Sequence, residues 1–256
     1  MTQWFYVYRQ WLIRELHIRF RSSSMGLAWL VLQPLVHILL FTLVFYKFFQ
    51  IRWPSGDGSP TEYGLQVFIG LSLYAFVAEI INRGPGSVWS YPYLVTKVRF
   101  PLPLLPGVLV GAAGVQLLLS LMIAVALAAL RDVHIETLLL PIFLLPLAAY
   151  GLALAWFLGA AGVYLRDIGH LAPSVSSLLM FLTPIFYPAS MIPKSLSWLV
   201  NINPLGWTSE AARSLLMHGL VPSWQLWGIH LLVSVISLVG AWWFFKRTQP
   251  GFADVL

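Results

Sequence analysis

The sequence predicts an all-α integral membrane protein, and its composition is the first reason. Of 256 residues, 59% are apolar and only 9% are charged, whereas soluble globular chains are about 45–50% apolar and ~25% charged. The apolar residues form stretches near the ~20 residues that a helix needs to cross a bilayer. The charges, net +6, gather between these stretches, where membrane proteins keep them. This pattern excludes a soluble enzyme, a disordered chain, a coiled coil and most nucleic-acid-binding proteins.

Six apolar stretches qualify or nearly qualify as membrane spans within one transmembrane domain over residues 1–256. The third and fourth carry no charge and are long enough to cross with a tilt or a kink. The expected spans are 25–49, 65–81, 100–130, 137–165, 171–187 and 224–245.

The stretch 188–222 between the last two spans is apolar but interrupted. Pro188, Pro193, Asn203 and Pro204 break it. Irregular backbone at membrane depth must be buried in protein or line a wet cavity, so we expect short helices that dip into the membrane edge.

The distribution of Lys and Arg predicts which side each loop faces. With the N-terminus inside, ten of the fifteen Lys and Arg residues lie in cytoplasmic segments, as the positive-inside rule requires. Six spans then place both termini in the cytoplasm.

Residues 1–24 carry an amphipathic helical pattern. Bases such as Arg14 lie on one side, and Trp4, Tyr8 and Trp11 lie on the other, which is typical of a helix in the membrane interface. A plain membrane anchor and a functional role both remain open. Several charges and the lack of an uninterrupted apolar core argue against a signal peptide.

The segment 82–99 is long for a connection between helices, which usually takes ~2–8 residues. It opens with the breaker run Gly84-Pro85-Gly86 and then presents Trp89, Tyr91 and Tyr93. Exposed aromatics flanked by bases indicate a docking surface for another protein. An interfacial aromatic belt is the equally weighted alternative.

Motifs for catalysis and metal binding are absent from the sequence. There is no P-loop, no His-Glu-x-x-His, no Gly-x-Ser-x-Gly and no cysteine, so we expect no catalytic residue and no metal site. Glu79 and His37 are the ionisable groups within spans, and Glu79 has a partner for an ion pair in Arg83, one turn on. Glu15 and Arg19 have the same spacing. Two isolated groups support an ion-driven carrier only weakly.

The spans also carry small residues and aromatics at helical spacing. Gly107, Gly111 and Gly114 in the third span, and Ala155, Gly159 and Gly162 in the fourth, predict close helix packing. His37, Phe41, Phe45 and Phe48 fall on one face of the first span. Such a stripe more often faces lipid or core, and a track for stacking sugar rings is the alternative. Span five adds Phe181, Phe186 and Tyr187.

Ordered motifs along the whole chain resemble the permease subunits of type-2 ABC exporters for O-antigen, teichoic acid and capsular polysaccharide. Each motif is weak alone, but their order and spacing follow the family. They are Arg14-Glu15-Leu16 with Arg19-Phe20, Ser24, Gly26, Trp29 and Pro34-Leu35; Lys97-Val98-Arg99-Phe100-Pro101 with Leu105-Pro106; Arg166-Asp167; Thr183 to Pro188 with Ile192-Pro193; Asn203-Pro204-Leu205 with Arg213; and Phe252-Ala253-Asp254.

This resemblance implies a homodimer that binds two copies of a separate P-loop ATPase. ATP and Mg²⁺ would belong to that subunit, so this chain would be no enzyme by itself and hold no cofactor. Residues 82–99 would couple to the ATPase, residues 188–222 would form re-entrant helices of an outer gate, and spans one and five would line the conduit. The implied coupling residues are Trp89, Tyr91, Tyr93, Lys97, Arg166 and Asp167; the implied conduit aromatics are Trp29, Phe41, Phe45, Phe48, Phe181, Phe186 and Tyr187.

The implied function is ATP-driven export of lipid-linked polysaccharide across the cytoplasmic (inner) membrane, and O-antigen is the favoured polysaccharide. We expect a basic rim of Arg14, Arg19, Arg21 and Arg99 to meet the lipid diphosphate, because guanidinium groups suit phosphate in charge and geometry. Membrane lipids are the other partners, and nucleic acid is not expected. Teichoic acid or capsule export, a type-2 permease for drugs or haem, an ion-driven carrier and a polysaccharide-processing membrane enzyme are the alternatives.

Overall fold

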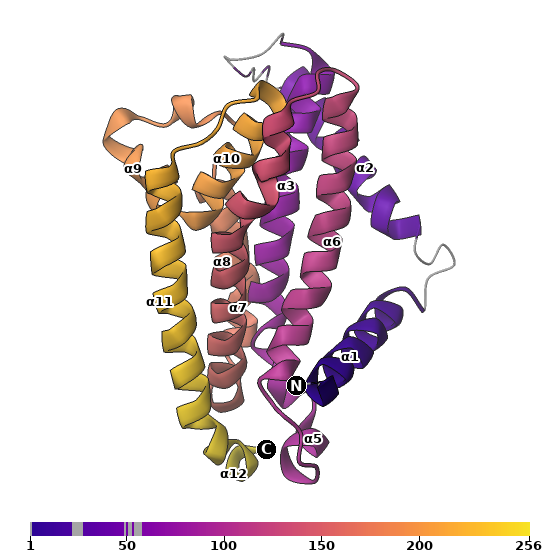
Figure 1. Cartoon of the computed structure of the whole chain (residues 1–256), viewed down its shortest axis with the longest axis vertical. Coiled ribbons are helices and arrows are strands. Elements are labelled where there is room, and N and C mark those ends of the chain that lie inside the picture. Colours follow the sequence, from indigo (N-terminus) through magenta and orange to yellow (C-terminus); the bar gives the residue numbers. More distant parts are fainter. Residues whose placement is uncertain (1, 22–27, 49, 51–52, 54–57) are drawn as a thin grey trace.

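The computed structural model describes residues 2–21, 28–48, 50, 53 and 58–256, and every regular element within them is a helix (Figure 1). Four helices of this part of the chain are long and apolar enough to cross a membrane. They are α3 (Pro60–Arg83), α6 (Leu104–Ala129), α7 (Leu140–Tyr164), which extends the 3₁₀ turn η3 (Ile135–Leu139), and α11 (Trp224–Thr248).

Two further apolar helices are shorter. The helix α2 (Trp29–Phe41) continues as the π-helix η2 (Thr42–Phe48), and α8 (Ile168–Leu182) has 15 residues. The helix α8 ends before residue 187, where the apolar run ends, because Thr183 precedes Pro184 and takes an extended conformation (φ −100°, ψ 136°). A residue before proline is driven out of the α region.

Side-chain caps fix where several helices begin. The Ser59 hydroxyl accepts from Glu62 N ahead of Pro60, and Ser223 does the same for Leu226 N at the start of α11. These caps satisfy amide groups that a helix start leaves without partners. Two of the four long helices, α3 and α11, thus have capped first turns.

The helix α3 forms the centre of the bundle. It packs against α2, α6, α7, α8 and α10 (Pro204–His218), and Phe68, Ile69, Leu73 and Ile80 are buried there. The helix α11 lies at the edge, mainly along α7. The helix α3 thus contacts five other helices of the bundle.

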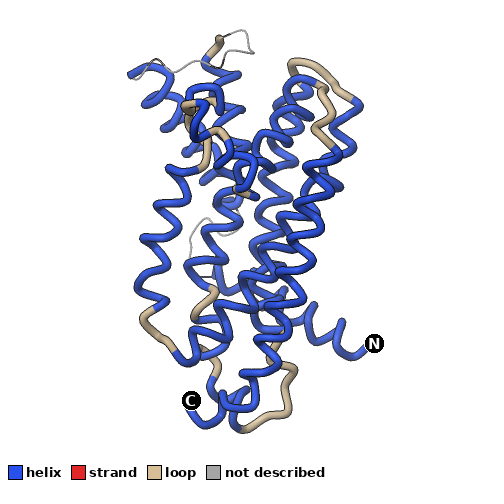
Figure 2. Tube along the Cα trace, turned by 90° about the vertical axis from the view of Figure 1, so that its left-hand side faces the viewer, coloured by secondary structure: helices blue, strands red, loops and turns tan. Residues whose placement is uncertain are grey.

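The two ends of the bundle differ (Figure 1). Both termini lie at one end with α5 (Pro92–Thr96) and α12 (Phe252–Val255), and α1 (Thr2–Arg21) runs obliquely to the bundle near this end. Figure 2 shows the same arrangement from the side. We call this the basal end.

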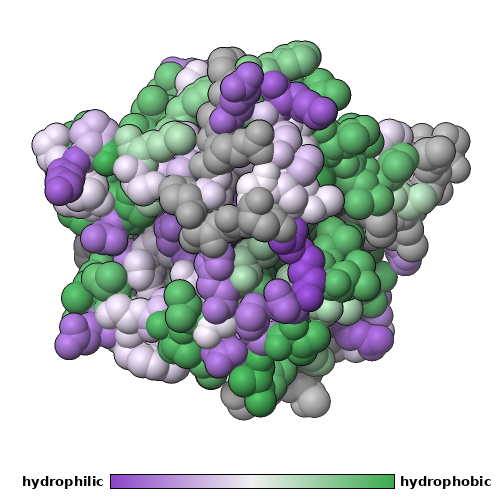
Figure 3. Space-filling model, turned by 90° about the horizontal axis from the view of Figure 1, so that it is seen from above, coloured by the Kyte–Doolittle hydropathy of each residue, from purple (hydrophilic) through white to green (hydrophobic). Residues whose placement is uncertain are grey.

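The opposite end carries α10 and short helical pieces. These are η4 (Ala189–Met191), η5 (Lys194–Leu196) and α9 (Trp198–Ile202). Seen from above, apolar residues lie along much of the right-hand and lower edges, and hydrophilic residues lie both near the middle and at several points of the rim (Figure 3). The interrupted stretch 188–222 thus folds as short elements plus one 15-residue helix, α10.

Candidate functional site

A groove of about 540 Å³ opens at the basal end. We call it the basal groove. Its walls come from α1, the end of α3, α4 (Gly86–Trp89), the start of α6 and the turn between α7 and α8. Among its lining residues are Trp11, Glu15, Arg83, Trp89, Tyr91, Arg166 and His170.

The segment that forms the floor of this groove is held by the small residues of α7. A Cβ at Gly162 would collide with the Pro85 carbonyl, and one at Gly159 would lie 2.7 Å from Ser87 Oγ. Val88, within the same segment, is completely buried and faces Gly159. The glycine face of α7 therefore provides a seat for residues 85–88, which confirms close packing there.

The expected coupling residues divide into two groups. Trp89, Tyr91 and Arg166 line the basal groove together. Tyr93, Lys97 and Asp167 lie outside its lining and are exposed at the same end, Tyr93 to 62%. The structure thus gathers three of the six residues around one cavity and leaves the rest on the nearby surface.

The helix α1 is docked onto the bundle by aromatic side chains. Trp11 packs edge-on against Tyr91, with ring centroids 5.5 Å apart, and against Phe100 at 5.3 Å. The Tyr8 hydroxyl donates to Gly107 O on α6 over 3.4 Å, and Gly111 leaves room for its ring. Burial raises the pKa of Tyr8, so this phenol stays a donor.

Arg83 joins α1 to the end of α3. Its Nη1 lies 3.0 Å from Glu79 Oε1, and its Nη2 pairs with Glu15. The expected pair of Glu79 and Arg83 is confirmed. Glu15 instead finds a partner 68 residues away, which helical spacing does not reveal; the side chain of Arg19 lies outside the described residues.

Three of the expected conduit aromatics form one cluster. Phe45 stacks on Phe186 with centroids 4.7 Å apart and planes 7° apart, and Phe41 lies 4.8 Å from Phe186. Tyr187 packs against this cluster. Phe186 is only 3% exposed, so within this chain the cluster joins the first and fifth apolar stretches.

Other conduit candidates lie outside that cluster. Trp29, Phe48 and Phe181 are 40%, 73% and 63% exposed. Phe48 leaves the stripe of Phe41 and Phe45 because residues 42–48 form a π-helix, whose i→i+5 hydrogen bonds widen the turn. The α-helical spacing that predicted a common face does not hold there.

The predicted basic rim is only partly described. The Arg14 guanidinium lies over the Trp11 ring at 4.7 Å. Arg99 lines a separate hollow of about 330 Å³ with Lys246. The side chains of Arg19 and Arg21 lie outside the described residues.

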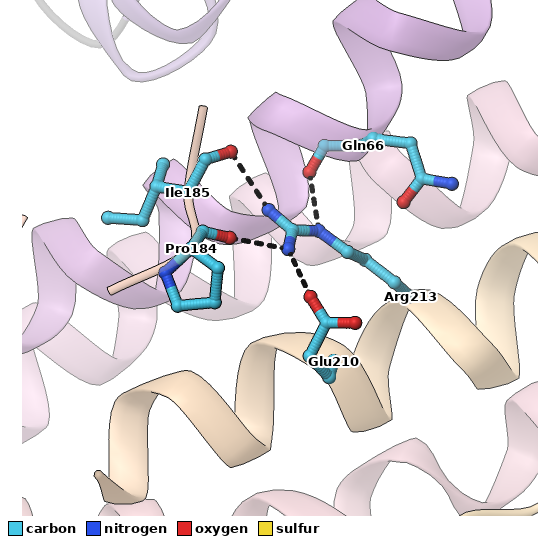
Figure 4. A network of polar contacts seen from close by, with 5 residues as sticks. All are labelled: Gln66, Pro184, Ile185, Glu210 and Arg213. Carbon is cyan, nitrogen blue, oxygen red and sulfur yellow. Dashed lines mark hydrogen bonds and ion pairs between the residues drawn. The ribbon is translucent and has the colours of Figure 1, made fainter. Parts of the chain in front are cut away.

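Arg213 forms a buried polar junction at the opposite end (Figure 4). The sequence marks this residue only as part of a motif with Asn203-Pro204-Leu205 and does not predict the junction. Its Nε donates to Gln66 O over 3.0 Å. Its Nη1 donates to Pro184 O over 2.7 Å, and its Nη2 to Ile185 O over 3.0 Å.

A carboxylate and an aromatic ring complete this junction. Glu210 Oε1 lies 2.7 Å from Arg213 Nη1, and the guanidinium lies 4.9 Å from the centroid of Trp53. Gly70 permits the approach, since a Cβ there would lie 2.5 Å from Arg213 Nη2.

The Arg213 junction provides hydrogen-bond donors for two backbone carbonyls that lie outside any helix. After α8 ends at Leu182, the carbonyls of Pro184 and Ile185 have no helical amide to donate a hydrogen bond to them, and such groups at membrane depth must be satisfied within the protein. Arg213 satisfies both and ties α10 to α3. The sequence signals for it are the motif that Arg213 forms with Asn203-Pro204-Leu205 and, not used in the sequence analysis, Glu210 three residues earlier.

Two polar contacts strengthen the same region. Asn203 Nδ2 donates to Thr183 Oγ1 over 2.9 Å, and the Tyr63 hydroxyl donates to Phe186 O over 2.8 Å. Within the described ranges, no three His, Asp or Glu side chains gather to hold a metal ion.

Four apolar helices of spanning length define a multi-pass membrane protein. More particularly, the chain belongs to the ABC-2 type transporter family, whose model matches residues 6–217. It is 28% identical to the O-antigen export system permease protein RfbA of Myxococcus xanthus, over 97% of this chain and 96% of that protein. Two Klebsiella pneumoniae proteins of the same name are 21% and 23% identical, each over 95% of this chain and 92% of the relative. The resemblance seen in the motifs is confirmed.

Proposed function

We propose that this chain is the membrane permease subunit of an ATP-driven exporter of lipid-linked polysaccharide, with O-antigen as the first candidate cargo. The observation that carries this proposal is full-length similarity to three proteins named O-antigen export system permease. ATP hydrolysis would belong to a separate P-loop ATPase, two copies of which would bind a dimer of this chain.

The proposed topology has six spans and two cytoplasmic termini in the inner membrane. The helix α2 has 13 residues and η2 has 7. Together they reach the ~20 residues that a span needs. The 15-residue α8 would complete its crossing with the extended residues that follow. The Lys and Arg bias supports a cytoplasmic basal end.

The proposed ATPase contact is the rim of the basal groove. Trp89 is 40% exposed and Tyr93 62%, and large exposed aromatics are common anchors of protein interfaces. Movement of α4 would reach α7 through its glycine seat and α1 through Tyr91 and Trp11. The basal groove therefore offers the ATPase a contact linked to several spans.

The proposed conduit follows the half-buried rings of Phe41 and Phe45, which pack on the buried Phe186. Stacking on sugar rings is weak and repeated, which suits a passing polymer. The lipid diphosphate would meet the basic rim of Arg14, Arg19, Arg21 and Arg99. The short helices of 188–222 would form the outer gate.

The coupling proposal is tested by Trp89→Ala with Tyr91→Ala in the complex assembled with its ATPase. We expect export and substrate-stimulated ATP hydrolysis to fall at least tenfold, the effect of losing ~1.4 kcal/mol of coupling. Trp224→Ala is the matched control, because Trp224 is 49% exposed at the start of α11, away from the basal groove and outside the proposed gate. Unchanged export and hydrolysis in the double variant would refute the coupling role.

Export of teichoic acid or capsule is the nearest alternative, and a drug or haem permease is the next. Proteoliposomes that contain the chain and its ATPase distinguish them by which cargo stimulates hydrolysis. We expect stimulation by lipid-linked glycan and none by amphipathic drugs or haem.

A further inference from the structure

A second cavity lies between α7 and α11, on the side of the bundle that the basal groove does not reach. Its volume is about 560 Å³, within the ~300–1,000 Å³ typical of ligand pockets. Its lining is apolar or aromatic apart from Ser237, whose hydroxyl donates to Val233 O in its own helix over 2.8 Å. We call this the α7–α11 groove.

Contacts above and below give the α7–α11 groove definite ends. Above it, Trp227 Nε1 donates to Ile142 O over 3.0 Å. Below it, the Tyr164 hydroxyl donates to Thr248 O over 2.8 Å. The two helices are thus joined at both ends and leave a recess between.

Small residues form the base of the recess and aromatic residues form its sides. Ala153 and Ala241 are buried beneath it, whereas Phe157 and Trp243 are 46% and 66% exposed beside it. A Cβ at Gly240 would meet nothing within 4 Å. The surface is therefore hollowed where a linear apolar chain could lie.

Arg247 places a positive charge on the side of α11 that lines the recess. Phe244 lines it, and Arg247 follows three residues later, so both lie on the same side of α11. Arg247 is exposed just beyond the apolar part of the helix. An apolar recess that leads to a guanidinium at the membrane surface matches an acyl chain joined to an anionic headgroup.

We propose that the α7–α11 groove binds an anionic phospholipid from the leaflet on the side of the chain termini. One acyl chain would lie in the recess, and its phosphate would meet Arg247. Within a bilayer the hydrophobic effect does not favour protein over lipid, so retention must come from shape and charge. The groove supplies the shape and Arg247 the charge.

The lipid is not the exported cargo in this proposal. Figure 1 places α11 and α2 on opposite sides of the bundle, so the α7–α11 groove lies away from the aromatic cluster of Phe41 and Phe45. The proposal depends on the chain spanning a membrane and not on the polysaccharide.

The test measures lipid retained by the purified full-length chain in native mass spectrometry after exposure to equal phosphatidylglycerol and phosphatidylcholine. Gly240→Leu should fill the recess and remove most of the retained phosphatidylglycerol. Gly228→Leu is the matched control, since Gly228 also lies in α11 and a Cβ there meets nothing within 4 Å. Leu favours a helix interior over Gly, so both variants should fold.

The charge is tested separately. Arg247→Gln should lower the preference for phosphatidylglycerol over phosphatidylcholine about fivefold, the effect of one surface cation. Lys194→Gln, at the opposite end, should leave the preference unchanged. Equal retention in all variants, or equal loss in Gly228→Leu, would overturn the site. Stronger retention of undecaprenyl diphosphate than of phosphatidylglycerol, with the same sensitivity to Gly240→Leu, would overturn the choice of ligand.

Discussion

The basal groove and the Arg213 junction hold the two ends of the molecule by different physical means. At the basal groove, Arg83 pairs with Glu15 and Glu79 while its side chain stays 47% exposed. At the other end, Arg213 is 2% exposed and has four polar partners. Exposed pairs contribute ~0–1 kcal/mol, whereas breaking a buried pair costs about 3–5 kcal/mol.

This difference indicates which end can rearrange at low cost. Contacts around the basal groove can break and re-form during a transport cycle, and the ATPase is proposed to act there. The Arg213 junction ties α10, α3 and residues 183–187 into one unit. If residues 188–222 form the proposed outer gate, we therefore expect them to move as a body about this junction.

The largest expected effect is that of Arg213→Met. Removing the guanidinium leaves Glu210 and three carbonyls without their buried partner, which should cost about 3–5 kcal/mol. A lower thermal unfolding temperature in detergent, measured by fluorescence-detected size exclusion, checks this.

Arg213→Lys separates the charge of the Arg213 junction from its hydrogen-bond geometry. A lysine keeps the charge but lacks the planar fork that reaches three carbonyls, so its unfolding temperature should lie between those of the wild type and Arg213→Met. Equal stability of all three proteins would show that the junction is not structural.

The next effect should come from Gly162→Ala. The added Cβ would collide with the Pro85 carbonyl, and such overpacking costs about 1–3 kcal/mol. We expect displacement of the 85–88 segment, with export lost more than folding. Gly114→Ala is the control, because a Cβ there meets nothing within 4 Å. Equal export by both variants would contradict the glycine seat.

A smaller effect is expected from Phe45→Ala. It removes the stacked contact with Phe186, and such pairs contribute ~0.5–1.5 kcal/mol beyond their buried area. Export should fall while co-purification with the ATPase persists. Phe48→Ala, outside the cluster, should export more than Phe45→Ala does. If Phe48→Ala exported less than Phe45→Ala, the cluster would not be part of the conduit.

The smallest effect should come from the pair of Glu15 and Arg83. A double-mutant cycle with Glu15→Gln and Arg83→Gln should give a coupling of ~0.5–1 kcal/mol that shrinks as salt is raised. A coupling of several kcal/mol, insensitive to salt, would show that the basal end is as firmly held as the Arg213 junction.

Local patterns in the sequence predicted much of the fold and part of the site. Apolar runs identified the stretches that become α3, α6, α7 and α11, because length and hydropathy alone determine a span. The pair of Glu79 and Arg83 was predictable from its i, i+4 spacing. Phe41 and Phe45 were placed on one face for the same reason.

Long-range features were out of reach of such patterns. Arg213 bonds to carbonyls 147 and 28 residues away, and carbonyls carry no side-chain signature. Phe48 was assigned to the stripe because the π-helix that displaces it was not anticipated. The α7–α11 groove depends on how two distant helices meet.

Transport in proteoliposomes tests the central claim most directly. The chain is reconstituted with and without its ATPase, and the lipid-linked glycan that becomes accessible on the far side is measured with ATP present. We predict translocation only with the ATPase and none when an ion gradient replaces it. Translocation by the chain alone, driven by an ion gradient, would contradict the claim that its power comes from a partner bound at the basal groove.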